Sequence, residues 1–160
     1  MKRLVENIIL QIETIHYGNA WIGVSYKKKL QLLTEYEFFY QFNGNHSIAE
    51  IISHVTTWRE ETILKIKSGA GSITDADPSN WKNISNLKKT GMKGILSSHD
   101  KSITALLNLL KDKNDDFLAE SYYDNDFKDY YPYKFVIEGM LHHDIYHLGQ
   151  IGLIMKLLPN

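Results

Sequence analysis

Two histidines near the C-terminal end of the chain have the spacing of a metal-binding pair. His143 and His147 are four residues apart in a segment with helical periodicity, so their side chains should leave one face of a helix. Two imidazoles placed in this way can bind one ion at about 2.0–2.1 Å. Asp144, Ile145 and Tyr146 lie between them, so the glutamate base of the zinc motif H-E-x-x-H is absent. The spacing also fits two histidines with separate hydrogen-bond partners.

The other histidines carry weaker signals. His54 borders the apolar face of an earlier predicted helix, and a single histidine in such a place is more often a hydrogen-bonded core or boundary residue than a metal ligand. It becomes a candidate ligand only in combination with the C-terminal pair. His142 lies about 100° around the helix from His143, so we expect it to be non-ligating. We expect His99 to be buried with a local partner. The remaining two, near predicted helix ends, are His16 and His46.

Four long amphipathic segments must position these residues. Apolar residues at helical spacing predict helices over residues 2–16, 47–68, 90–111 and 132–158, with short helical stretches over 26–33 and 34–39. Residues 68–80 read as a surface loop and 112–129 as a polar crossover connection, and no strand is expected. The prediction is one all-α domain spanning residues 1–160, a four-helix bundle in which facing side chains build the site inside the core.

Individual residues predict where the second long helix begins and ends. Ser47 and Glu50 have the capping-box form, in which the hydroxyl accepts from a helical amide and the glutamate reaches back. Gly69 is suited to the left-handed conformation that ends a helix. Pro132 suits the first turn of the last helix.

Composition narrows the chemistry. The chain has no cysteine, which excludes disulfides and thiolate ligands, so a metal must be held by nitrogen and oxygen. Its 18 basic and 19 acidic residues leave a net charge of −1, without the basic patch of a nucleic-acid binder. No apolar run is long enough to span a membrane, and the amphipathic N-terminus is unlike a signal peptide. The default expectation is a cytoplasmic protein.

Three stretches resemble the DinB-like family, which is related to the YfiT-like metal-dependent hydrolases. The most specific is HDIYHLGQI at 143–151; HSIAEIISHVTTW at 46–58 and AWIG at 20–23 are similar to the family's second helix and to its loop after the first helix. The resemblance covers nearly the whole chain in the expected order. It implies a four-helix bundle with crossed connections, and frequent homodimers.

The resemblance also implies a divalent metal held by one histidine of the second helix and two of the last, which map onto His54, His143 and His147. Three imidazoles would leave an open coordination position, the arrangement of catalytic sites. Asp144 and Gln150 are candidate partners of the ligating rings. Nickel and zinc are the first candidates for the ion, then manganese and iron.

The leading functional hypothesis is a metal-dependent enzyme that acts on a small molecule, either as a thiol S-transferase or as a hydrolase. The resemblance implies that the substrates of some relatives include a low-molecular-weight thiol. The sequence identifies no catalytic residue beyond the candidate ligands. The alternative is a non-catalytic metal-binding bundle, and a third reading is a metal-free helical interaction module.

Overall fold

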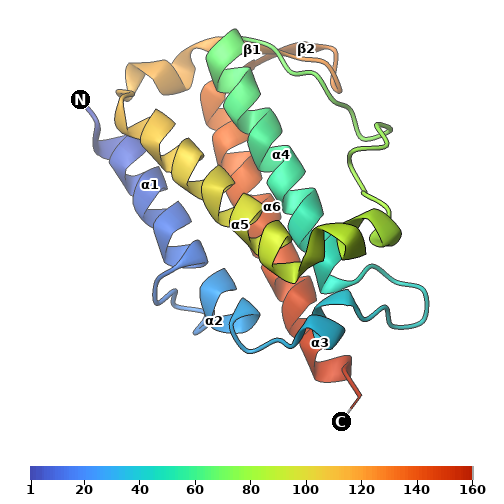
Figure 1. Ribbon diagram of the computed structural model, residues 1–160. Helices are drawn as coiled ribbons and strands as arrows, with labels where there is room; N and C mark the ends of the chain where they lie inside the picture. The colour runs from blue at the N-terminus through green and yellow to red at the C-terminus, as the bar shows by residue number, and fades with distance from the viewer. Residues whose placement is uncertain (160) are drawn as a thin grey trace.

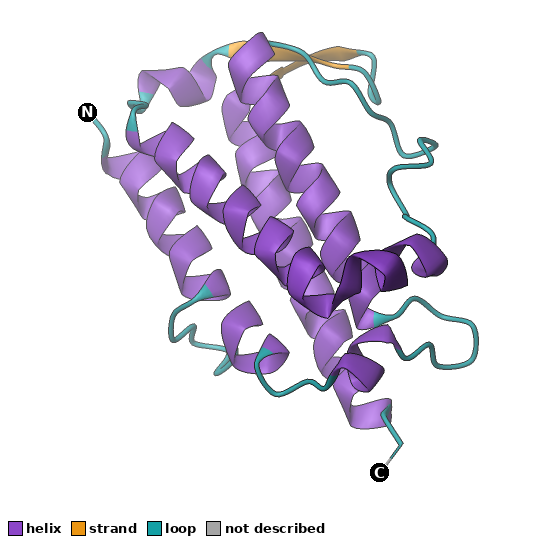
Figure 2. Cartoon of the chain, in the orientation of Figure 1, coloured by secondary structure: helices purple, strands orange, loops and turns teal. Residues whose placement is uncertain are grey.

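The computed structural model describes residues 1–159. Helices dominate the chain, and a short two-stranded hairpin lies at one end of them (Figures 1 and 2). The elements in order are α1 (Arg3–His16), α2 (Tyr26–Leu30), α3 (Glu35–Phe39), α4 (Ile48–Ser68), α5 (Ile84–Lys111), the 3₁₀ turn η1 (Asp116–Ala119), β1 (Ser121–Asp124), β2 (Asp129–Pro132) and α6 (Tyr133–Leu157).

The four long helices α1, α4, α5 and α6 form the predicted bundle. Helix α4 packs against both α5 and α6, and α1 contacts the same two helices from the other side, so α1 and α4 lie diagonally opposite. The chain therefore crosses the bundle between α1 and α4 and again between α5 and α6. The segment between α4 and α5 returns along the length of the bundle, so these two neighbours run in the same direction (Figure 1).

Local signals in the sequence define the ends of α4. The Ser47 hydroxyl accepts from the backbone N–H of Glu50 at 3.2 Å, and the Glu50 carboxylate accepts from the backbone N–H of Ser47 at 2.8 Å. Such a cap contributes about 1 kcal/mol to helix stability. Gly69 ends the helix with φ 75°, in the left-handed region that favours glycine. Both predicted signals are confirmed, and Thr34 with Glu37 forms a second capping box before α3.

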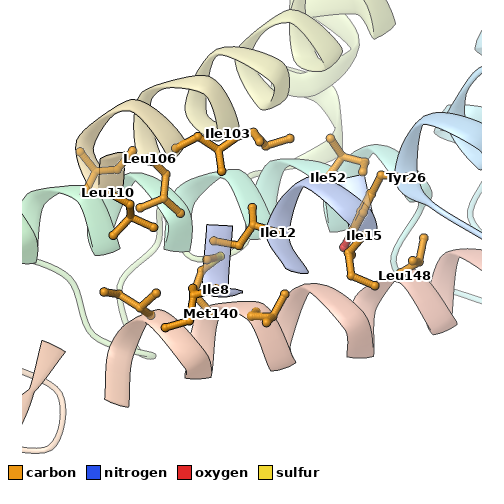
Figure 3. Packing of buried hydrophobic residues seen from close by; sticks show 14 of the residues in the cluster. Ile8, Ile12, Ile15, Tyr26, Ile52, Ile103, Leu106, Leu110, Met140 and Leu148 are labelled. Carbon is orange, nitrogen blue, oxygen red and sulfur yellow. The ribbon is translucent and has the colours of Figure 1, made fainter. Parts of the chain in front are cut away.

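Branched aliphatic side chains fill the centre of the bundle. Figure 3 shows residues of α1, α5 and α6 turned toward one another, among them Ile8, Ile12, Ile103, Leu106 and Met140. Ile12, Ile103 and Leu106 are completely buried. Burial of one such side chain stabilises the fold by roughly 1.5–3 kcal/mol, so this core holds the helices that carry the candidate ligands.

Two sequence-based expectations were wrong. The polar stretch expected to be a plain crossover contains the antiparallel hairpin β1–β2, in which Tyr122 pairs with Tyr131 and Asp124 with Asp129. Helix α5 begins at Ile84, six residues before the predicted start, with a kink at Gly91, whose φ of 73° an L-residue rarely adopts. Among residues 1–159, no helix combines the length and the apolar character of a membrane span.

Candidate metal centre

Helix α4 presents His54 to the space between α4 and α6. The ring is buried, and its Nδ1–H donates to the backbone carbonyl of Asn80 at 3.0 Å. The indole of Trp81 stacks on the ring, with centroids 3.9 Å apart and planes within 4° of parallel. Asn80 is itself fixed, because its side-chain oxygen accepts from the Trp58 indole N–H at 2.8 Å. The neutral ring therefore carries its lone pair on Nε2, away from Asn80.

Helix α6 presents His143 and His147 from successive turns of one face, as the spacing predicted. Their Nε2 atoms lie 3.0 Å apart. The Nδ1–H of His147 donates to the side-chain oxygen of Gln150 at 2.6 Å, which again leaves the lone pair on Nε2. Gln150 thus lies where an outer partner of a ligating histidine belongs. His142 is exposed on a different side of α6, as expected.

The three candidate rings converge on one point. The Nε2 of His143 lies 2.9 Å from that of His54 and 3.0 Å from that of His147, and the three ligand atoms all fall within 4.8 Å of one another. Nitrogens bound to one ion at about 2.0–2.1 Å are separated by roughly 2.9–3.4 Å, depending on the bond angle. His54 and His147 both direct a lone pair into this space, where a cation would accept both, and His143 would supply the third nitrogen. The donor set therefore fits a divalent ion.

The surroundings keep these rings neutral and ready to coordinate. Burial, followed by the proximity of the other two rings, lowers the pKa of His143 to about 4. Burial also lowers the pKa of His147 to about 4, although the hydrogen bond to Gln150 opposes the shift. The pKa of His54 is lowered by burial as well, against the opposing effect of its bond to Asn80. Near neutral pH no proton has to leave before an ion binds.

A cavity of about 690 Å³ opens over the three histidines. Its walls come from α4, α6, the hairpin and the loop that holds Asn80. The lining is largely aromatic, with Trp58, Trp81, Phe127, Phe135 and Tyr146. A cavity of this size accommodates a small molecule, and an apolar lining with few polar groups is typical of such sites.

Asp144 follows His143 directly but turns away from the cavity. Its carboxylate is completely buried and accepts from Arg59 at 2.8 Å and from the Nε2–H of His16 at 2.9 Å. Burial raises the pKa of this carboxyl, but the Arg59 charge and the bond from His16 outweigh it, so the pKa lies well below its usual range. Among residues 1–159, the Asp144 side chain therefore hydrogen-bonds to His16 and Arg59 and to no candidate ligand, which differs from the expected role as a partner of a ligating ring.

The buried network around Asp144 draws a residue from each long helix. Arg59 of α4 also donates to the Ser102 hydroxyl of α5 at 2.9 Å, and the Tyr26 hydroxyl donates to the backbone carbonyl of Asp144 at 2.7 Å. His99 is buried beside Arg59, outside the candidate metal centre, as expected. The network ties α1, α4, α5 and α6 together one residue away from His143.

Sequence reasoning missed several residues around the site. Asn80 and Trp81 lie in the loop between α4 and α5, whose path the sequence does not specify. Lys65 and Asp124 form a buried ion pair at 2.8 Å on the cavity wall. One sequence feature could have placed Lys65 near the site: it lies eleven residues after His54 and therefore on the same face of the helix.

Comparison with known proteins places the chain in a family. The family model described as the DinB superfamily matches residues 26–151. A solved structure from Bacillus subtilis, YfiT, described as a probable metal-dependent hydrolase with an unusual four-helix bundle topology, is similar in fold with a TM-score of 0.64 and 15% sequence identity. The match covers 98% of this chain and 90% of that one. No curated protein matched the sequence.

Proposed function

Because this chain belongs to the DinB superfamily, we propose that it is a metal-dependent enzyme that activates a water or thiol nucleophile for attack on a small electrophile. The observation that carries the proposal is the convergence of His54, His143 and His147 at the floor of a cavity. Three protein ligands leave a coordination position open, whereas structural zinc sites are usually closed by four. When bound, a divalent ion would supply Lewis acidity that lowers the pKa of water or of a thiol.

The protein's own residues would hold and orient this centre. Asn80 and Gln150 accept hydrogen bonds from Nδ1 of His54 and His147, which fixes the tautomer and ring plane of both ligands. The stacked indole of Trp81 covers one face of His54 and restricts the access of bulk water. The aromatic walls would bind the apolar part of a substrate and hold its reacting atom near the three histidines.

The two chemistries differ in the nucleophile. In thiol transfer, a carbon–sulfur bond forms as the bond from that carbon to the leaving group breaks, the leaving group departs with the electron pair, and the thiol proton passes to solvent. In hydrolysis, water takes the place of the thiol, and an acyl or similar bond is cleaved. The YfiT description supports the hydrolase, and the absence of a glutamate in the helical histidine motif disfavours a mechanism of the H-E-x-x-H type.

The decisive experiment uses untagged protein loaded separately with zinc, nickel, manganese and cobalt. Each form is assayed for transfer of low-molecular-weight thiols to an aromatic halide and for hydrolysis of small esters and amides. Activity that requires the ion and disappears in His147→Ala supports the proposal, with His142→Ala as the matched control. Stoichiometric metal without turnover in any assay would instead favour a non-catalytic metal-binding protein.

A further inference from the structure

A second polar cluster lines the end of the cavity away from the histidines. The Lys65 ammonium donates to the Asp124 carboxylate at 2.8 Å, and the Tyr122 hydroxyl donates to the same oxygen at 3.0 Å. All three side chains are buried, yet all three line the cavity. Lys65 comes from α4 and the other two from β1, so the cluster exists only where the hairpin meets the helix.

The carboxylate of this cluster is saturated. One oxygen of Asp124 accepts from Lys65 and Tyr122, and the other accepts from the backbone N–H groups of Asp126 and Phe127. Burial raises the pKa of Asp124, but these donors, Lys65 foremost, outweigh it and hold the pKa below its usual value. Asp124 therefore has little capacity to bind a further donor, and its role is to hold the Lys65 ammonium in place.

The ammonium, by contrast, has donors to spare. Of its three N–H groups, one is used by a protein acceptor within residues 1–159, at Asp124. The Lys65 nitrogen lies 5.9 Å from the centre of the Trp58 ring and 5.4 Å from that of Tyr122, so aromatic faces flank it. A buried cation with unused N–H groups on a cavity wall is a site for a hydrogen-bond acceptor of a ligand.

The distance from this cluster to the histidines sets the size of that ligand. The rings of Trp58 and His54 have centres 6.5 Å apart, and the Lys65 nitrogen is 5.9 Å from the former, so it lies at most about 12 Å from the His54 ring. Lys65, Trp58 and His54 share one face of α4. Aromatic side chains line the cavity between Lys65 and the three histidines.

We propose that Lys65 anchors the uncharged, hydrogen-bond-accepting tail of an elongated substrate, such as an amide carbonyl, while the other end of the substrate reaches the three histidines. The inference rests on the proposed function and assigns the substrate class for that site. The tail is uncharged because Asp124 already neutralises the lysine. A carboxylate placed there would be buried close to the Asp124 carboxylate, which is unfavourable in a buried site.

The test measures ligand binding and not turnover. Cobalt-loaded protein is titrated with three series of thiols that end in an amide, a carboxylate or a methyl group. Each series covers chains of two to eight carbons, so that the three end groups are compared at the same chain length. Binding is followed by the thiolate-to-cobalt absorption band. We expect the amide to bind about tenfold tighter than the methyl compound at an intermediate chain length, the effect of one charge-assisted hydrogen bond, and to exceed the carboxylate as well.

Three variants sharpen this test. Lys65→Met should reduce the amide advantage to within twofold, whereas Lys67→Met, on the exposed side of the same helix, should leave it unchanged. Asp124→Asn leaves the lysine charge uncompensated and should reverse the preference, so that the carboxylate binds tighter than the amide. This reversal tests the inference even if Lys65→Met does not fold.

The outcomes are distinguishable. Equal binding of amide and methyl thiols by the cobalt protein, or an unchanged preference in Asp124→Asn, would overturn the role of Lys65 while leaving the metal centre intact. Failure of the wild-type protein to bind cobalt, or of any thiol to produce the band, would overturn the proposed activation of a thiol and the inference with it.

Discussion

Arg59 donates a 2.8 Å hydrogen bond to the carboxylate of Asp144 in the completely buried interior, and this pair joins the two helices that carry the candidate metal ligands. Arg59 lies five residues after His54 on α4, and Asp144 directly follows His143 on α6. The pair therefore fixes how α4 and α6 sit against each other next to the site.

The first prediction concerns this pair. Arg59→Met should lower the free energy of unfolding by about 3–5 kcal/mol, because it leaves the Asp144 carboxylate buried without its main partner. Urea denaturation of the metal-free protein measures the change. The double variant with Asp144→Asn should recover part of the loss, since the uncompensated charge is then removed. A loss below about 1 kcal/mol in Arg59→Met would show that the pair does not stabilise this packing.

The second prediction concerns acid and the metal-free protein. Burial lowers the folded-state pKa of His16, His99, His143 and His147 below the ordinary value of 6.5. The unfolded chain therefore binds more protons than the folded chain as the pH falls below 6.5, and stability must decrease with falling pH. We expect the urea midpoint to drop steadily between pH 7 and pH 5. A midpoint that stays constant or rises over this interval would contradict the neutral buried histidines.

The third prediction concerns metal affinity and pH. Since the pKa values of His143 and His147 are about 4, protons compete little for these nitrogens above pH 5.5. Three histidines with the ordinary pKa of about 6.5 would lose roughly 1,000-fold in affinity between pH 7.5 and pH 5.5. We expect less than a tenfold loss for zinc, measured by competition with a chromophoric chelator. A loss near the larger value would show that the rings are not held neutral.

The fourth prediction concerns Gln150. Gln150→Leu removes the acceptor for Nδ1 of His147 and should weaken metal binding by about 10–100-fold, the usual effect of removing the partner of a ligating histidine. Gln150→Glu keeps an acceptor and should retain or strengthen binding. Gln11→Leu, on the exposed side of α1, serves as the matched control. Equal affinity in the leucine and glutamate variants would contradict an orienting role.

Much of the fold could be predicted because its signals are local. The Ser47–Glu50 capping box and Gly69 define α4 from neighbouring residues alone, and the four-residue spacing of His143 and His147 sets their common face. The hairpin was missed because its tyrosines lie within an acidic, polar stretch, and because β1 packs against α4 and β2 against α6, contacts that the local sequence does not show.

The surroundings of the site could not be predicted from local patterns. Arg59 and Asp144 are 85 residues apart, and only the crossed connections of the bundle bring them together. Each alone resembles a charged residue on a solvated helix. Trp81 stacks on His54 only because the loop after α4 folds back along the bundle, and that path is fixed by Asn80. Such contacts depend on tertiary packing.

The most direct measurement of the central claim is the metal content of single histidine variants of the untagged protein, determined by elemental analysis after loading and dialysis. The wild-type protein should hold one equivalent of divalent ion. His54→Ala, His143→Ala and His147→Ala should each lose most of it, whereas His142→Ala, adjacent to a candidate ligand but exposed, should keep it. Retention of a full equivalent by all three substituted ligands would contradict the metal centre proposed for this bundle.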